Sequence, residues 1–136
     1  MDDTLRQTAL VAVSTGMTVL IWLVQLIIYP SFHHIRPEAF VAWHRAYTGL
    51  IAVVVVPLMV GQAGLVVWRL ADGRSDPATL ALAVSVAGAW VATAVWSVPC
   101  HDRLQRGHDP VVIRRLVATN AVRTAAWTAA LPLAMV

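Results

Sequence analysis

Histidine is concentrated in two short polar stretches of this sequence, and each stretch follows a strongly apolar run. The first, YPSFHHIRPEAFVAWHRAY (residues 29–47), contains His33, His34 and His44, and the second, which begins VPCHDRL at residue 98, contains His101 and His108. Neutral imidazole is a common ligand for zinc, copper and iron, and histidine also serves as an acid or a base near neutral pH. The two stretches therefore mark a candidate site.

A metal site at this place would need ligands from both stretches. The candidate ligands are His33, His34, His44 and His101, with Glu38 or Asp102 as an oxygen donor. His33 and His44 would lie roughly 16 Å apart in one unbroken helix, too far for a single ion, but Pro30 and Pro37 argue against an unbroken helix. Copper or iron is the predicted ion, with haem as the alternative. Solvated interfacial histidines without a metal stay open as well, because no signature such as HExxH is present.

Aromatic residues share a helical face with His44. Phe40, Trp43, His44 and Tyr47 stand at positions i, i+3, i+4 and i+7, which is one face of a helix that begins near Pro37. One interpretation is an aromatic belt at the level of the lipid head groups. The other is that this face lines the mouth of a helical bundle, where Trp43 and Tyr47, together with Trp127 from the last helix, would contact a bound cofactor.

An arginine lies within the last apolar run. Asn120, Arg123 and Trp127 are spaced i, i+3 and i+7, so they share one helical face, with Thr124 beside them. An arginine at the centre of a bilayer costs at least about 2.5 kcal/mol and usually faces the bundle interior or a cavity. None of the four apolar runs contains Asp or Glu, so the possible partners are Glu38 or Asp102, helix-end carbonyls, Gln25 or Gln62, lipid phosphate, or a bound anion. An arginine that snorkels or clamps loops is the structural alternative.

The segment VPCHDRL (residues 98–104) places an acid next to a histidine. Pro99 predicts a break at the end of the third helix, which would point Cys100, His101 and Asp102 in different directions. His101 backed by Asp102 is then a candidate acid–base group or metal ligand. Cys100 is the only cysteine, which excludes an intramolecular disulfide, a CxxC redox pair and a cysteine zinc cluster.

The elements that must position these residues follow from the composition. The 136 residues are 59% hydrophobic and 12% charged, with a mean hydropathy of +0.70, whereas soluble domains carry about 25% charged residues. Four runs approach the ~20 apolar residues that span a bilayer, and a chain in lipid must satisfy its backbone within helices. We therefore predict an all-α transmembrane four-helix bundle, one domain over residues 1–136, with helices near 8–29, 37–69, 78–99 and 111–135.

Prolines and arginines set the predicted boundaries and orientation. Pro30 is expected to close the first helix, while Asp76 or Ser75 caps the third and Asp109 caps the fourth. An even spacing of helices puts both histidine connections on one side of the membrane. Those connections carry six arginines and the opposite side three, which favours a cytoplasmic location for the connections in a plasma or inner membrane. The first run is long and lacks a small-residue cleavage motif, so it is expected to remain as an anchor.

Together these features resemble the anthrone-oxygenase-like family of small four-helix membrane proteins. The resemblance lies in the aromatic and histidine stretch after the first helix, in the Pro-x-His turn of VPCHDRL, and in the element N-x-x-R-T-x-x-W, which here is Asn120, Arg123, Thr124 and Trp127. It implies four helices and, for some members, oxygenation of phenolic or polyketide aromatics without a conventional organic cofactor. A fold does not by itself establish such an activity.

Three functions are open on the sequence. In a membrane oxidoreductase, Arg123 and Asn120 would hold an oxyanion of a hydrophobic phenolic or quinone-like substrate, with His44 and His101 as bases or metal ligands. In a non-catalytic membrane subunit, facing histidines would ligate haem, or the bundle would anchor a partner protein. A small transporter ranks last, because proton-coupled carriers usually need an intramembrane acid. The lipid bilayer is the expected partner, a homo-oligomer or membrane complex is open, and ten dispersed basic residues with net charge +3 do not suggest nucleic-acid binding.

Overall fold

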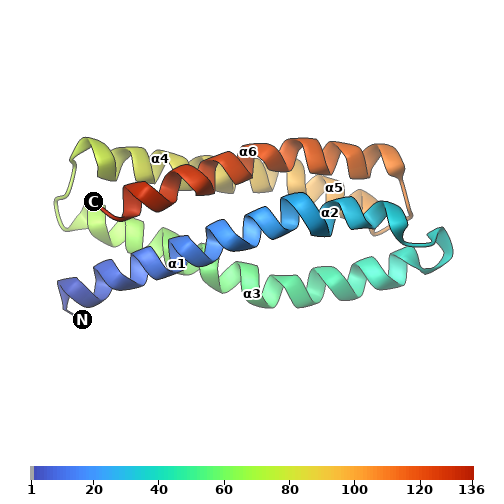
Figure 1. The fold of residues 1–136 in the computed structure, drawn as a ribbon, viewed down its shortest axis with the longest axis horizontal. Helices are drawn as coiled ribbons and strands as arrows, with labels where there is room; N and C mark the ends of the chain where they lie inside the picture. The colour runs from blue at the N-terminus through green and yellow to red at the C-terminus, as the bar shows by residue number, and fades with distance from the viewer. Residues whose placement is uncertain (1) are drawn as a thin grey trace.

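Four helical rods form the part of the chain that the computed structural model describes, residues 2–136 (Figure 1). The predicted all-α four-helix bundle is confirmed, although residue 1 of the predicted domain lies outside the described part. The first rod joins α1 (Asp3–Leu23), η1 (Val24–Ile28), α2 (Tyr29–Ser31) and η2 (Phe32–His34). The second is α3 (Pro37–Ala71), the third joins α4 (Pro77–Ala92), η3 (Thr93–Ser97) and α5 (Val98–Leu104), and the fourth is α6 (Pro110–Ala134).

Three of the rods are long and apolar enough to cross a membrane. They are Asp3–His34, Pro37–Ala71 and Pro77–Leu104, with mean hydropathies of 2.1, 2.5 and 1.9. The fourth rod, α6, carries three arginines and is less apolar. Large apolar side chains such as Leu50, Val53 and Val84 are more than 70% exposed on the outside of the bundle. An apolar exterior of this kind is consistent with a membrane protein.

Both histidine connections lie at one end of the bundle, which confirms the predicted arrangement. In Figure 1 the turns at residues 35–36 and 105–109 are at the right-hand end. The two chain ends and the turn at residues 72–76 lie at the left-hand end. The connections are shorter than predicted, because the first and third helices extend past Pro30 and Pro99 to His34 and Leu104. The polar residues of the two stretches therefore lie mainly on helices rather than in loops.

The prediction that Pro30 and Pro99 interrupt their helices is wrong, and the reason is local. Each proline follows one π-helical turn, η1 before Pro30 and η3 before Pro99. Within these turns Tyr29 N–H donates to Val24 O and Val98 N–H donates to Thr93 O, five residues back. A proline in a regular α-helix removes one hydrogen bond and clashes with the carbonyl four residues earlier. A π turn relieves that conflict and is often found at functional sites.

Two aspartates begin the later helices, as predicted. Asp76 accepts hydrogen bonds from Ala78 N and Thr79 N at the start of α4, and from the Thr79 hydroxyl at 2.7 Å. The hydrogen bonds from Thr79, first that of its side chain, hold the pKa of Asp76 below its ordinary value. Asp109 accepts from Val111 N and Val112 N at the start of α6. Both caps satisfy backbone N–H groups that a helix start leaves without partners.

The interior of the bundle contains polar as well as apolar side chains. An apolar cluster that includes Phe32, Leu104 and Ile113 fills the half near the histidine connections. A smaller cluster that includes Leu10 and Leu82 fills the half near the chain ends. Among residues 2–136, nine polar or charged residues are also buried: Ser14, His44, Gln62, Arg69, Thr79, Ser97, Asn120, Arg123 and Thr124. The interior of the bundle therefore holds a set of polar groups, although many large apolar side chains lie on its outside.

Candidate functional site

The two central histidines of the sequence lie in direct contact. His44 Nε2, on α3, is 2.9 Å from His101 Nδ1, on α5, and the two rings are stacked with centroids 5.2 Å apart. His44 is fully buried; Phe40 stacks on its ring at 5.4 Å, and Phe32 meets it edge-on at 5.6 Å. The predicted face of Phe40, His44 and Tyr47 therefore turns into the bundle. This placement agrees with the interpretation that the face lines the mouth.

Tyr29 connects the histidine pair to Arg123. The Tyr29 hydroxyl is 3.0 Å from His101 Nε2, and it accepts a hydrogen bond from Arg123 Nη1 at 3.4 Å. Tyr29 is 4% exposed, and its backbone N–H closes the π turn η1. His101 thus uses both ring nitrogens within the bundle, one toward His44 and one toward Tyr29.

Arg123 is held by neutral groups alone. Its Nη1 donates to Ser97 Oγ and to Asn120 Oδ1, both at 3.0 Å, and its guanidinium lies 5.0 Å from the Trp127 ring centre. The two ion pairs within residues 2–136 are Arg6–Asp3 and Arg103–Asp109, so no described carboxylate pairs with Arg123. Its Nε has no hydrogen-bond partner in the same described range. The positive charge is therefore hydrogen-bonded without being neutralised.

A cavity of about 320 Å³ opens between α3 and the η3–α5 segment, next to this arginine. Tyr29, Ser97, His101 and Arg123 form the inner part of its polar lining. The other polar lining residues are Tyr47, Thr48, Thr93, Gln105 and Asp102, an exposed carboxylate that forms no ion pair with Arg123. The opposite wall is apolar and comes from α3 residues such as Ile51, Val55 and Met59. The main contacts of α3 are with α1 and α4 rather than with α5, which leaves this side of the bundle open. The cavity thus combines apolar residues of α3 with a hydrogen-bonding lining that includes the cation of Arg123 and the carboxylate of Asp102.

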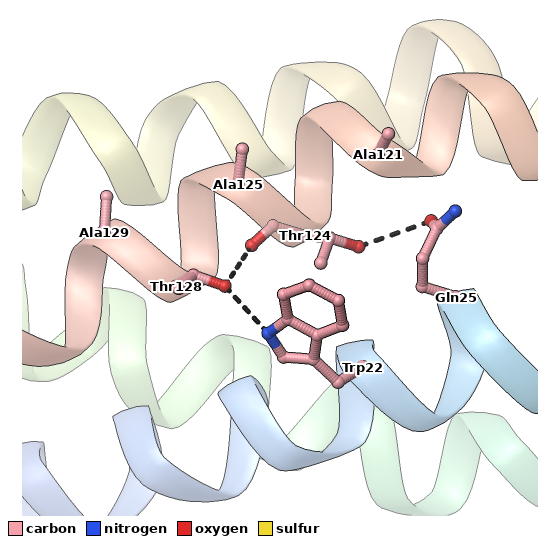
Figure 2. Close-up of a pocket in the computed structure, with 7 residues that line it drawn as sticks. All are labelled: Trp22, Gln25, Ala121, Thr124, Ala125, Thr128 and Ala129. Carbon is pink, nitrogen blue, oxygen red and sulfur yellow. Dashed lines mark hydrogen bonds between the residues drawn. The ribbon is translucent and has the colours of Figure 1, made fainter.

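The polar network continues from Arg123 through Asn120 to Gln25 and Thr124. Asn120 Nδ2 donates to Gln25 Oε1 at 2.8 Å, and the Thr124 hydroxyl contacts the same oxygen at 3.4 Å. Gln25 and Thr124 line a shallow groove of about 450 Å³ between α1 and α6 (Figure 2), whose other lining residues are Trp22, Ala121, Ala125, Thr128 and Ala129. The indole of Trp22 bridges this groove by donating to Thr128 Oγ1 at 3.1 Å. Gln25, one of the predicted partners of the arginine, therefore acts through Asn120.

The predicted metal set is not assembled in the structure. His33, His34 and Glu38 are exposed, because the η2 turn and the start of α3 point them away from the interior. Residues 2–136 contain no group of three His, Cys, Asp or Glu side chains that could hold a metal ion. Three of the four ring nitrogens of His44 and His101 already form hydrogen bonds. The structure therefore does not bring His33, His34 or Glu38 together with His44 and His101.

Haem ligation by the facing histidines does not fit this geometry either. Two imidazole nitrogens on opposite sides of one metal lie about 4 Å apart, twice a metal–nitrogen bond of ~2.0 Å. The facing nitrogens of His44 and His101 are 2.9 Å apart and share a hydrogen bond. The residues present at this place therefore fit neither a three-ligand metal site nor a bis-histidine haem.

Asp102 does not back His101 as predicted. Asp102 is exposed, and Tyr29 and His44 occupy the two ring nitrogens of His101. The helix continues through this segment, and adjacent residues of a helix point about 100° apart.

Cys100 is buried, and His108 packs edge-on against the Phe40 ring at 4.9 Å. The remaining aromatic candidates have different contacts. Trp43 stacks on Tyr47 with ring centroids 5.5 Å apart, whereas the indole N–H of Trp127 donates to Gln62 Oε1 at 2.9 Å.

Two residues of the inner polar lining were not singled out from the sequence, Tyr29 and Ser97. Each lies at the end of a π turn, one or two positions before Pro30 or Pro99. A polar residue just before a proline inside a long apolar run was the available signal. Because each proline was expected to end its helix, the residue before it gave no reason to expect a polar group in the bundle interior.

Known proteins do not add an assignment to this geometry. Comparison with protein-family models, with curated proteins and with solved structures found no match for the chain. The side chains around Arg123 and the cavity beside them are consequently the basis for a functional proposal.

Proposed function

We propose that this protein is a multi-pass membrane oxidoreductase whose cavity binds a hydrophobic molecule with a phenolic or quinone-like head group. All four rods would cross the bilayer, with both histidine connections on the cytoplasmic side. The apolar exterior and the three long apolar rods support the multi-pass arrangement. The fourth rod, α6, could also cross the bilayer, because its Arg123 is only 6% exposed and faces the bundle interior rather than the lipid.

The observation that carries the proposal is the uncompensated charge of Arg123 at the edge of an apolar cavity. Its described partners are the neutral groups of Ser97, Asn120 and Tyr29. A buried charge without a counter-charge is costly, and a phenolate or enolate oxygen would supply that counter-charge. Such a ligand also brings an aromatic ring, which suits the wall of Ile51, Val55 and Met59. A small hydrophilic anion would leave this apolar wall without a contact.

The chemistry that suits this pair of walls is deprotonation followed by oxidation. A substrate proton would pass to the imidazole of His101, and the electron pair would stay on the substrate oxygen beside Arg123. The electron-rich substrate would then reduce molecular oxygen, the co-substrate. When a ring CH₂ becomes C=O, four electrons pass to O₂, one oxygen atom enters the product and the other leaves as water. Oxygenation of this kind is also what the resemblance to the anthrone-oxygenase-like family implies.

Binding of an ionisable aromatic probe tests the role of Arg123. We expect detergent-purified protein to bind 2-naphthol as its anion, which is distinguished from the neutral phenol by its longer-wavelength absorbance. A charge-assisted hydrogen bond contributes about 1.5–3 kcal/mol, so Arg123→Gln should weaken binding by ~10- to 100-fold. Arg69→Gln is the matched control, because Arg69 is also buried but does not line the cavity.

Two results would overturn the proposal. One is equal affinity of the Arg123→Gln and Arg69→Gln proteins for the probe, and the other is binding of 2-naphthol in its neutral form. Oxygen uptake with anthrone as the substrate gives the corresponding test of activity. We expect uptake by the native protein and loss of uptake in His101→Ala. Uptake that is unchanged in His101→Ala would remove the oxidoreductase assignment.

A further inference from the structure

The hydrogen bonds that run from Arg123 to His44 have a direction. Arginine has only N–H donors, so Arg123 Nη1 is the donor in its 3.4 Å contact with the Tyr29 oxygen, where it shares a proton with one of its shorter bonds to Ser97 and Asn120. The Tyr29 hydroxyl has one proton, and its other polar neighbour is His101 Nε2 at 3.0 Å. If Tyr29 donates to His101, then Nε2 is the acceptor nitrogen of a neutral imidazole and the proton of His101 is on Nδ1.

The same logic extends to His44. His101 Nδ1–H donates to His44 Nε2 at 2.9 Å, so the proton of His44 is on Nδ1. His44 Nδ1 is buried and has no hydrogen-bond partner among residues 2–136. This direction leaves one polar atom without a partner, the Nδ1–H of His44. The reverse direction leaves two, the Tyr29 proton and the Nδ1 lone pair of His44, so the first direction is favoured.

We propose that Tyr29, His101 and His44 form a directed proton relay between the cavity and the histidine end of the bundle, and that Tyr29 exchanges the proton with the bound ligand. The direction itself rests on the hydrogen-bond geometry alone. The role of the relay in substrate deprotonation rests on the proposed function. Tyr29 is suited to the exchange because it lines the cavity and lies next to Arg123.

The relay step conserves protons at every stage. The ligand O–H bond breaks as a proton joins the Tyr29 oxygen, and the Tyr29 proton passes to His101 Nε2. The Nδ1 proton of His101 then passes to His44 Nε2, so that the transferred charge rests on a His44 imidazolium at the histidine end. One proton has crossed from the cavity, no electron has moved along the relay, and the ligand remains as an anion beside Arg123.

Nitrogen-15 NMR of the histidine rings tests this direction without any substrate. Protonated and unprotonated ring nitrogens differ widely in chemical shift, so the spectrum reports the tautomer of each ring. In protein labelled at histidine and held at neutral pH, we expect both His44 and His101 to carry their proton on Nδ1, with assignments from single His→Gln variants. A proton on Nε2 of either ring, or on both nitrogens of one ring, would overturn the relay.

Tyr29→Phe tests the role of the hydroxyl while keeping the ring. We expect the nitrogen shifts of His101 to move toward a mixture of tautomers, because Nε2 has lost its donor. Tyr47→Phe is the matched control, since Tyr47 lines the same cavity and forms no hydrogen bond with either histidine. Unchanged His101 shifts in Tyr29→Phe would overturn the assignment of Tyr29. If Tyr29→Phe does not fold, the tautomers of the native protein still decide the direction.

The two proposals are separated by the remaining measurement. Tyr29→Phe should weaken 2-naphtholate binding less than Arg123→Gln does, because Ser97 and Asn120 still hold Arg123 in place, while oxygen uptake with anthrone falls at least tenfold. Native tautomers on Nδ1 without any oxygen uptake would support the relay and reject the oxidoreductase. Oxygen uptake that is unaffected by Tyr29→Phe would reject the relay and leave the oxidoreductase standing.

Discussion

Asn120 should contribute more to the stability of the bundle than Gln25, although the two side chains share a hydrogen bond. Asn120 is fully buried; it accepts from the guanidinium of Arg123 and donates to Gln25. Gln25 is only half-buried, and its contacts are with the neutral groups of Asn120, Thr124 and Val117. Asn120→Leu keeps the number of side-chain heavy atoms and removes one charge-assisted hydrogen bond, to Arg123, and two neutral ones, to Gln25 and Thr124. Gln25→Leu removes neutral hydrogen bonds alone.

The expected sizes follow from these bonds. Hydrogen bonds between transmembrane helices average about 0.6 kcal/mol and reach ~1.7, whereas bonds to a charged group contribute about 1.5–3 kcal/mol. Asn120→Leu should therefore lower the free energy of unfolding by ~3–4 kcal/mol, and Gln25→Leu, which removes three neutral bonds, by ~2 kcal/mol. The coupling energy of the double variant should be ~0.6–1.7 kcal/mol, the contribution of the single Asn120–Gln25 bond.

Unfolding by sodium dodecyl sulfate in mixed micelles, followed by far-ultraviolet circular dichroism, measures these differences. Thr119→Ala is a suitable control, because Thr119 on the same helix bonds only to backbone oxygens of its own helix. If Asn120→Leu costs less than Gln25→Leu, Asn120 is not the main anchor of Arg123. A coupling energy of zero would show that the 2.8 Å contact contributes nothing to stability.

Three further perturbations have definite expected outcomes. Arg69→Met should leave the bundle equally or more stable in the same unfolding assay, because Arg69 Nε and Nη1 are buried without a partner in the described chain, whereas Arg123→Met should destabilise it. The lowered pKa of Asp76 means that its capping contribution is present above the ordinary carboxyl pKa of ~4 and is lost as the pH falls through the lower value of the folded protein. The unfolding midpoint of Asp76→Asn should therefore depend less on pH than that of the native protein below about pH 4. Cys100 is buried, so a maleimide should label it only after unfolding, and rapid labelling of the folded protein would contradict its position.

The four rods could be predicted from the sequence because lipid permits few alternatives. A run of about 20 apolar residues in a bilayer must be a helix, and short turns between helices then place both histidine stretches at one end. The ends of the helices could not be predicted in the same way. A proline ordinarily ends a helix, but Pro30 and Pro99 each follow a π turn that allows the helix to continue. No pattern in the sequence predicts a π turn.

One part of the candidate site could be predicted from helical spacing, and another part could not. The shared face of Asn120, Arg123 and Trp127 follows from helical spacing, and all three are buried in the structure. That His44 and His101 lie at the same end of the bundle could be predicted from the sequence. Their direct contact also depends on how each helix is rotated about its own axis, which could not be predicted. The pairing of His101 with Asp102 failed because adjacent positions on a helix diverge, a consequence of the helix continuing past Pro99. Sequence adjacency was a poor guide to contact once that helix extended.

The contrast between the two buried arginines argues for a ligand at Arg123. Both Arg69 and Arg123 are almost fully buried, and neither pairs with a carboxylate within residues 2–136. Arg123 differs in having Ser97, Asn120 and Tyr29 arranged around one of its nitrogens, beside a cavity. Neutral acceptors fix the direction of a guanidinium but leave its charge in place. The neutral acceptors lower the free-energy cost of burying the guanidinium but do not remove it. An anionic ligand beside Arg123 would offset the rest of that cost, which would favour its binding.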